Sequence, residues 1–236
     1  MLVSHRYQFI YTKTKKTAGT SVESFFERFC MADGEWEQSH TREQYESSSG
    51  IIGFRGAKTP PNTRWYNHMS ASEIKKLLGD DTWNRYFKFC VIRNPFVKCV
   101  SAFEHFGKKF KVNKFNLLHR FATAGMTSEQ SRFLSYVSKS AQNVDRDKYV
   151  IDGTFCLDDI IRFESLETDI ARICEHLSLP YDPQYLPTFK KGHRRKDATV
   201  ESLYTPAAKK RVAKMFDFEL AQFNYEFPAP SSDSVS

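Results

Sequence analysis

The segment Lys16-Thr17-Ala18-Gly19-Thr20-Ser21 constrains the fold most, because it stands where an apolar strand gives way to a helix. Periodicity predicts the strand over Tyr7–Tyr11 and a helix that begins near Thr20. Amide groups at the start of a helix have no partner within it, and the helix dipole places partial positive charge there. Gly19 lets the backbone come close to a ligand, and Lys16 adds a full charge. The junction is therefore a candidate anion site.

The same turn carries three hydroxyl side chains, those of Thr17, Thr20 and Ser21. All three can donate to phosphate oxygens. In the alternative interpretation, Thr20 or Ser21 is simply an N-cap of the helix. The cluster of Lys13, Lys15 and Lys16 favours the anion, because neighbouring positive charges repel one another unless solvent or an anion compensates them.

The order of these residues differs from that of the phosphate-binding loop of nucleoside triphosphatases, G-x-x-x-x-G-K-[ST]. Here Lys16 precedes Gly19, which is the only glycine of the turn. The sequence also offers no clear strand-ending aspartate to hold magnesium, so a magnesium nucleotide fits poorly. We expect an anion that is bound without metal.

A second junction of strand and helix follows at residues 86–106. The strand is predicted over Tyr86–Ile92, and Asn94 and Pro95 are good N-cap and first-turn residues for the next helix. Side chains at helical spacing, Phe96, Val100 and Phe103, should face the core. Arg93 then lies at the carboxyl edge of a strand, where ligands bind in open α/β sheets, and Ser101 could support it. Taken singly, Arg93 and Ser101 are equally well explained as structural residues.

His68 is the best candidate base. Ser70 and Glu73 form a capping box, which places His68 just before a helix, where its side chain can reach outward. The ordinary pKa of histidine lies near physiological pH, so His68 can take a proton from a hydroxyl. A solvated or capping role is the alternative.

Together these motifs resemble the sulfotransferase superfamily that uses 3′-phosphoadenosine 5′-phosphosulfate (PAPS), in particular its carbohydrate branch similar to heparan sulfate 2-O-sulfotransferase. In that family the first loop holds the 5′-phosphosulfate, and an R-[ND]-P motif with a helical serine holds the 3′-phosphate. Segments 160–167 and 221–227 also resemble the family's late strand and its ending. Two positions depart from the pattern: Lys15 stands where relatives often have proline, and Lys98 where they have arginine.

The resemblance implies a three-layer α/β fold, with a mostly parallel central sheet flanked by helices, related to nucleotide kinases. We expect one domain over residues 1–228 and a loose tail at 229–236. Further helices are predicted at Phe115–Ala124, Ser128–Tyr136, Leu166–Leu177 and Pro206–Asn224.

The resemblance also implies the chemistry, which is in-line sulfuryl transfer from PAPS to an acceptor hydroxyl with release of adenosine 3′,5′-bisphosphate. Lys16 would stabilise the leaving phosphate, and His68 would activate the acceptor. The residues expected to bind the nucleotide in the two motifs are Lys15, Lys16, Thr17, Ala18, Gly19, Thr20, Ser21, Arg93 and Ser101.

A third basic cluster spans residues 190–196 and is predicted to be a loop. The resemblance favours a flap over the nucleotide, with contacts from Lys191, Gly192, His193, Arg194 and Arg195. A solvated surface run and a site for an anionic acceptor are the alternatives.

The pattern is broken between Met31 and Thr63, except for a short strand at Gly50–Phe54, and acceptor contacts are expected there. The candidates are Arg55, Lys58, Arg64, Trp65 and Tyr66. Each, taken singly, is also explained by loop packing. We expect a carbohydrate or small natural product as the acceptor, and the sequence fixes neither its identity nor the oligomeric state.

Composition supports a globular enzyme: 236 residues, 40% of them hydrophobic and 15% aromatic, with a formal net charge of +7. A basic protein that binds RNA phosphates without sulfuryl transfer is the runner-up, although no nucleic acid is the primary expectation. The five cysteines lack metal or disulfide spacing, so we expect free thiols and no metal. Without a signal or membrane segment, the sequence is typical of a soluble cytoplasmic protein with no membrane partner.

Overall fold

A computed structural model of the chain describes residues 1–107, 125–139, 144–187 and 200–229. The chain forms two compact units, which are considered separately below. The first comprises Met1–Ile92 and Asp145–Lys191, and the second comprises Arg93–Val144 and Gly192–Ser236. One domain over residues 1–228 stays a prediction. The predicted tail lies outside the described residues from position 230 onward.

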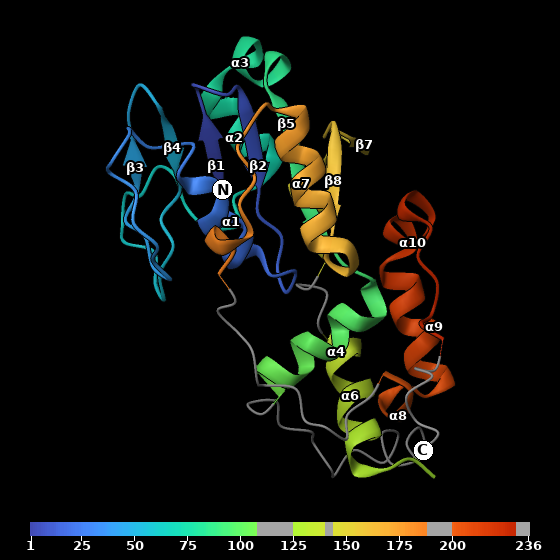
Figure 1. The fold of residues 1–236 in the computed structure, drawn as a ribbon. Coiled ribbons are helices and arrows are strands. Elements are labelled where there is room, and N and C mark those ends of the chain that lie inside the picture. Colours follow the sequence, from blue (N-terminus) through green and yellow to red (C-terminus); the bar gives the residue numbers. More distant parts are fainter. Residues whose placement is uncertain (108–124, 140–143, 188–199, 230–236) are drawn as a thin grey trace. The chain divides into compact units, whose positions relative to one another are not determined.

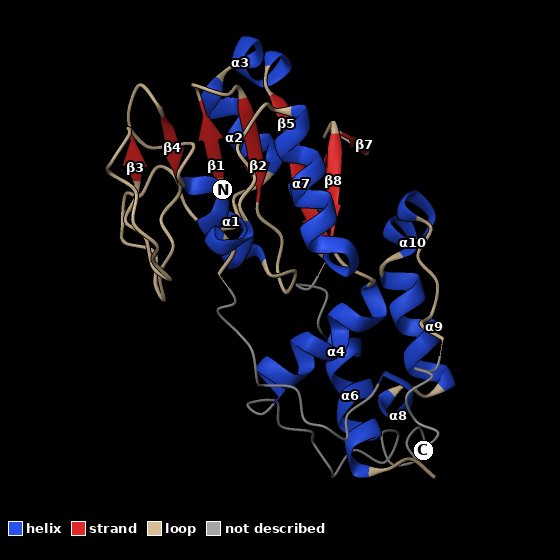
Figure 2. Cartoon of the chain, viewed as in Figure 1, coloured by secondary structure: helices blue, strands red, loops and turns tan. Residues whose placement is uncertain are grey.

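The first unit is built on a six-stranded sheet with the order β3-β4-β1-β2-β5-β8 (Figures 1 and 2). Its strands are β1 (Leu2–Ser4), β2 (Phe9–Thr12), β3 (Tyr45–Glu46), β4 (Gly50–Ile52), β5 (Phe87–Ile92) and β8 (Asp159–Arg162). Strands β2, β5 and β8 run parallel, whereas β1, β3 and β4 add antiparallel pairs. The expected α/β class is confirmed, with a mixed sheet. The strand predicted at Tyr7–Tyr11 is β2, and β1 before it escaped prediction.

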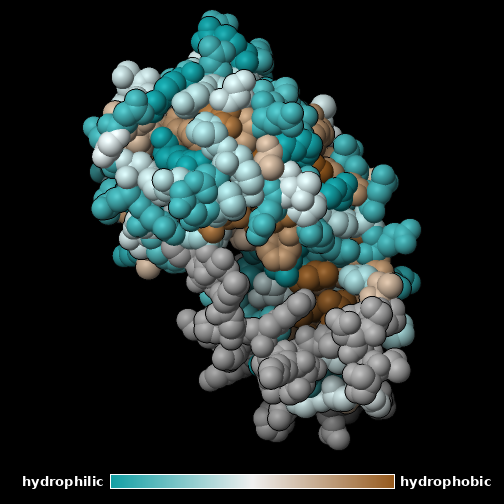
Figure 3. Space-filling view, in the orientation of Figure 1, coloured by the Kyte–Doolittle hydropathy of each residue, from teal (hydrophilic) through white to brown (hydrophobic). Residues whose placement is uncertain are grey.

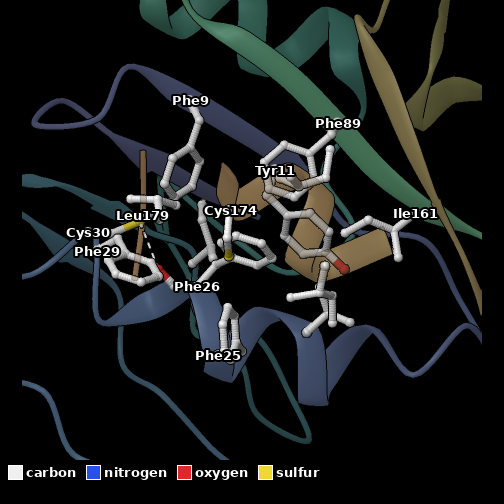
Figure 4. Close-up of a cluster of buried hydrophobic side chains, with 14 of the residues drawn as sticks. Phe9, Tyr11, Phe25, Phe26, Phe29, Cys30, Phe89, Ile161, Cys174 and Leu179 are labelled. Carbon is white, nitrogen blue, oxygen red and sulfur yellow. Dashed lines mark hydrogen bonds between the residues drawn. The ribbon is translucent and has the colours of Figure 1, made fainter. Parts of the chain in front are cut away.

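Helices cover both faces of this sheet, and the alternation of strand residues explains why. Phe9 and Tyr11 of β2 point to a core shared with α1 (Gly19–Glu27) and α7 (Leu166–His176), as Figure 4 shows in part. Ile10, between them, points to the opposite core, with α2 (Ala71–Leu78) and α3 (Asp80–Arg85). Successive strand residues face opposite sides, so a strand buried on both sides has no polar face. The predicted three-layer arrangement is present in this unit.

Shorter elements complete the first unit. They are a hairpin of β6 (Val150–Ile151) and β7 (Thr154–Phe155) and three 3₁₀ turns, η3 (Arg146–Lys148), η4 (Phe163–Ser165) and η5 (Pro183–Tyr185). Strand β8 and helix α7 confirm the late strand and helix that the sequence predicted.

The described part of the second unit is helical. It contains α4 (Pro95–Phe106), α6 (Ser128–Lys139), α8 (Val200–Leu203), α9 (Pro206–Met215) and α10 (Asp217–Phe223). As predicted, Phe96, Val100 and Phe103 lie in its core. The single helix expected over Pro206–Asn224 is wrong, because Phe216 leaves helical geometry with its ring buried and divides the segment into α9 and α10. The helix predicted at Phe115–Ala124 lies outside the described residues.

The face drawn in Figure 3 is mostly hydrophilic over the described residues. Among the residues described, Phe106 is the large apolar side chain that stands most open to solvent, at half exposure. The helices described here are all too short or too polar to cross a bilayer. All five cysteines are free thiols, and Cys30, Cys90, Cys99 and Cys174 are buried.

Candidate functional site

Helix α1 begins at Gly19 without a side-chain cap from the described part of the chain. Its N-cap residue is Ala18, in left-handed geometry with φ 57°, and its first turn contains no acidic residue. The N-cap role considered for Thr20 or Ser21 is therefore wrong, because both lie inside the helix. Within the described residues, neither a capping side chain nor a carboxylate in the first turn offsets the positive end of the helix dipole, so this turn is suited to an anion.

The turn before the helix has an unusual backbone. Lys16 and Ala18 both adopt positive φ, at 61° and 57°. Left-handed geometry costs a residue with a Cβ about 1 kcal/mol or more, so surrounding contacts must hold it. One such contact joins the Lys15 amide to Asp145 Oδ2 at 2.7 Å. Side chains at Lys15, Lys16, Thr20 and Ser21 remain partly exposed around this turn.

Thr14 and Thr17 fix the turn from beneath. The Thr14 hydroxyl donates to the carbonyl oxygen of Val91 on β5. Because a hydroxyl has one hydrogen, the contact of 2.7 Å between Thr14 Oγ1 and Thr17 Oγ1 must use the Thr17 proton. Thr17 is also buried. The expectation that its side chain donates to phosphate is thus wrong, and the side chain ties the loop to the sheet instead.

Lys13 has a structural position that the sequence did not reveal. Its ammonium is buried and lies 2.6 Å from Glu23 Oε2 on α1. The compensating charge for this lysine is therefore a carboxylate of the protein, and only Lys15 and Lys16 of the three lysines remain partly exposed. A Cβ at Gly19 would lie 3.2 Å from two carbons of Lys13, so Gly19 also lets this side chain pass.

Glu23 and Glu27 form the centre of a buried ion network. Arg55 Nη1 lies 2.8 Å from Glu23 Oε2 and also pairs with Glu27, while Arg42 Nη2 lies 3.3 Å from Glu27 Oε2. Burial alone would raise the pKa of Glu23, but Lys13 and other nearby cations hold it far below its ordinary value. Sequence reasoning missed these glutamates. The available signal was two acidic residues four apart on a helix with no other charged side chain.

Arg55 and Trp65 do not line a surface for an acceptor as predicted. Arg55 is 3% exposed and serves the ion network. Trp65 is 1% exposed in the core, and its indole nitrogen donates to Glu46 Oε2 at 3.0 Å. The sequence pattern did not predict this burial, because both residues lie in irregular segments where no periodicity marks the buried positions.

The other acceptor candidates are more open. Arg64 is exposed and lies 3.3 Å from Glu46 Oε1, and Lys58 is exposed. Tyr66 donates to Glu73 Oε1 at 2.6 Å, and this hydrogen bond raises the pKa of Tyr66 to about 12. A contact of these residues with an acceptor stays a prediction.

His68 precedes α2, as predicted, and the capping box of Ser70 and Glu73 is present. The His68 side chain is partly buried, and Nδ1 lies 3.1 Å from the backbone oxygen of Lys13. A carbonyl can only accept, so Nδ1 carries the proton and Nε2 has the lone pair. Burial lowers the pKa of His68 to about 4, and the Lys13 charge adds to this effect. The imidazole is therefore neutral at physiological pH and able to accept a proton.

The second unit carries the R-N-P motif. The Asn94 side chain accepts from the Phe96 amide at 3.0 Å, which confirms it as the N-cap of α4. Arg93 and Ser101 are partly exposed. Lys98 is buried, with Nζ 5.6 Å from the centre of the Phe216 ring. The basic loop, with Lys191, Gly192, His193, Arg194 and Arg195, lies outside the described residues.

Within the described ranges, no group of three His, Cys, Asp or Glu side chains is arranged to hold a metal ion. A search of curated proteins and a search of solved structures each found no match to this chain. The model of the sulfotransferase family, in contrast, matches residues 1–226. That span includes both strand-to-helix motifs and nearly the whole sequence. The chain belongs to the sulfotransferase family, and it is a sulfotransferase enzyme.

Proposed function

We propose that this sulfotransferase moves the sulfuryl group of PAPS to an acceptor hydroxyl, with His68 as general base. The observation that carries the proposal is the start of α1, where no described side chain caps the helix and Lys16 stands beside it. Bound PAPS would supply a sulfate activated by its bond to a phosphate. The residues at this turn fit such an anion, because they combine helix amides, a cation and the hydroxyls of Thr20 and Ser21.

The loop residues would act mainly on the leaving group. Transfer forms a bond between sulfur and the acceptor oxygen and breaks the bond between sulfur and the bridging oxygen, which leaves with the electron pair. Lys16 and the amides from Ala18 to Thr20 would stabilise the negative charge that develops on that oxygen. Thr20 already accepts a long contact of 3.5 Å from Lys13 Nζ, so its own proton stays available for the anion.

His68 would take the acceptor proton on Nε2. Its neutral state and the Nδ1 contact with Lys13 support this role, because the tautomer with a free Nε2 is the one that a base requires. The acceptor is proposed to be a carbohydrate or a small natural product.

Arg93 and Ser101 are proposed to bind the 3′-phosphate of PAPS, on the strength of the R-N-P motif alone. Lys191 to Arg195 are proposed as further contacts to the nucleotide. Arg64, Lys58 and Tyr66 remain the proposed acceptor contacts, because the side chains of Arg64 and Lys58 are exposed and that of Tyr66 is partly so.

The test is incubation with radiolabelled PAPS and a panel of carbohydrate and small-molecule hydroxyl acceptors, following release of adenosine 3′,5′-bisphosphate. Release should require one acceptor class and should appear with equal moles of sulfated product. His68→Gln should lower kcat by about a hundredfold while its affinity for adenosine 3′,5′-bisphosphate, measured by calorimetry, changes little. Full activity of His68→Gln would refute the assigned base. Salt-dependent RNA binding without turnover on any acceptor would favour a phosphate-binding role instead.

A further inference from the structure

Lys13 connects His68, the candidate base, to helix α1 through its backbone oxygen and its ammonium group. Its backbone oxygen accepts the hydrogen bond from His68 Nδ1 at 3.1 Å. Its ammonium lies 2.6 Å from Glu23 Oε2, on the second turn of α1. The side chain is 2% exposed and the Glu23 side chain is fully buried, so water does not weaken this pair.

Three features restrain the Lys13 residue at once. Its backbone continues β2, which ends at Thr12. Its stem packs against Gly19, where an added Cβ would lie 3.2 Å from two carbons of the stem. Its tip is held by Glu23. A residue fixed at the backbone, stem and tip has little freedom to rotate its carbonyl group, so the acceptor of the His68 bond has a defined direction.

We propose that Lys13 is a positioning residue for His68, in which the ion pair with Glu23 fixes the carbonyl that selects the histidine tautomer. This inference rests on the proposed role of His68 as the base, and it assigns Lys13 no contact with the donor or acceptor. This role differs from the one expected for Lys15 and Lys16, whose partly exposed side chains lie on the turn before α1.

The surrounding charges make the role testable by removing the lysine. The network holds four cations, Lys13, Arg55, Arg42 and the Met1 ammonium, and two carboxylates, Glu23 and Glu27. Replacing Lys13 by the similarly shaped methionine leaves Glu23 paired with Arg55 and the Met1 ammonium, and Glu27 paired with Arg55 and Arg42, so both buried carboxylates keep cationic partners. We therefore expect Lys13→Met to fold.

The primary measurement is the tautomer of His68, read from long-range ¹H–¹⁵N NMR spectra of histidine-labelled protein. The His68 signals are identified by their loss in His68→Gln. In the unaltered chain, Nδ1 should be protonated, whereas Lys13→Met should show a mixture of the two tautomers. Glu23→Gln provides a second variant, because it keeps the shape and a hydrogen bond but removes the charge that holds the ammonium. The matched control is Lys76→Met, which removes an exposed lysine of α2.

The second measurement separates positioning from binding. Lys13→Met should lower kcat about tenfold or more, since a misdirected base loses alignment with the acceptor, while the Kd for adenosine 3′,5′-bisphosphate changes little. The charged groups near His68 are Lys13 and the Met1 ammonium, which disfavour its protonation, and Asp145, which favours it. Lys13→Met should therefore raise the pKa of His68 in an NMR titration, and Lys13→Arg should not.

The results distinguish this inference from the proposed function. A folded Lys13→Met variant whose His68 keeps a single Nδ1-protonated tautomer would overturn the positioning role. Loss of that tautomer with unchanged kcat would support the positioning role but refute His68 as the base. Loss of the tautomer together with a lower kcat and an unchanged Kd would support both.

Discussion

Arg55 Nη1 lies 2.8 Å from Glu23 Oε2 and also contacts Glu27, so one guanidinium from the segment after β4 joins two glutamates on successive turns of α1. The Arg55 and glutamate side chains are almost fully buried. The other two nitrogens of this guanidinium also form hydrogen bonds, because Nε and Nη2 donate to the carbonyls of His40 and Ser39 at 3.0 and 2.9 Å. The network therefore fixes the irregular segment before β3 to helix α1.

Arg55→Leu should destabilise the fold substantially. The substitution removes one of the two cations that pair with Glu27, the other being Arg42. It also removes the hydrogen bonds that two backbone carbonyls accept from Arg55. Breaking a buried ion pair costs about 3–5 kcal/mol. The measurement is the free energy of unfolding in urea. Arg64→Leu is the control, because its ion pair with Glu46 is about half exposed, and it should cost less than about 1 kcal/mol. Equal losses for the two variants would contradict the structural role of Arg55.

The parts of the fold that follow from local rules were predictable. The strand at β5, the N-cap Asn94 and the capping box before α2 each depend on residues within one turn of each other. The buried network could not be predicted in the same way. Its partners Lys13, Glu23 and Arg55 come from separate elements, and sequence spacing carries no signal for pairing between such elements.

In the candidate site, too, the features set by local sequence were predicted and those set by tertiary packing were not. The turn before α1 and the location of His68 before α2 were predicted, because both are set by the start of a neighbouring helix. The inward direction of Thr17 and the contact of His68 with Lys13 were not, because they depend on how β2 and β5 pair and on how a loop from residue 68 packs beside them. The sequence identifies a hydroxyl or imidazole side chain but does not show the direction in which it points.

Lys16→Met should lower kcat by about a hundredfold, because it removes the charge proposed to stabilise the leaving phosphate. The loss should appear in single-turnover sulfuryl transfer with PAPS and the acceptor identified in the panel. Lys76→Met, on the exposed side of α2, controls for loss of a lysine and should retain the wild-type rate. Unchanged turnover by Lys16→Met would remove this lysine from the proposed chemistry.

Arg93→Ala should weaken nucleotide binding by about tenfold or more and leave kcat at saturating PAPS nearly unchanged. The proposed contact is to the 3′-phosphate, so calorimetry with two ligands tests it directly. The variant should lose affinity for adenosine 3′,5′-bisphosphate but bind adenosine 5′-phosphate, which lacks that group, as the unaltered chain does. Equal losses for both nucleotides would contradict a specific contact with the 3′-phosphate. Arg93→Lys should recover only part of the affinity, because lysine cannot form the bidentate contact.

The pH dependence of activity should reflect the depressed pKa of His68. Burial and the Lys13 charge lower that pKa to about 4, whereas histidine in an unfolded chain titrates near 6.5. The neutral base thus persists through mildly acidic conditions, so kcat/KM should stay level from pH 7 to pH 5 and fall only as the pH approaches 4. A decline centred near pH 6.5 would show that His68 titrates normally.

The depressed pKa of His68 also predicts how the free energy of unfolding changes with pH. Between pH 6.5 and about 4 the unfolded chain binds a proton that the folded chain rejects, so the free energy of unfolding should decrease as the pH falls through this window. The full contribution of His68, about 3 kcal/mol, is present above pH 6.5 and is lost at the lower end. His68→Gln should remove this slope in urea unfolding measured at successive pH values. A slope that persists in His68→Gln would assign the effect to other groups, and it would leave the neutral state of the base without thermodynamic support.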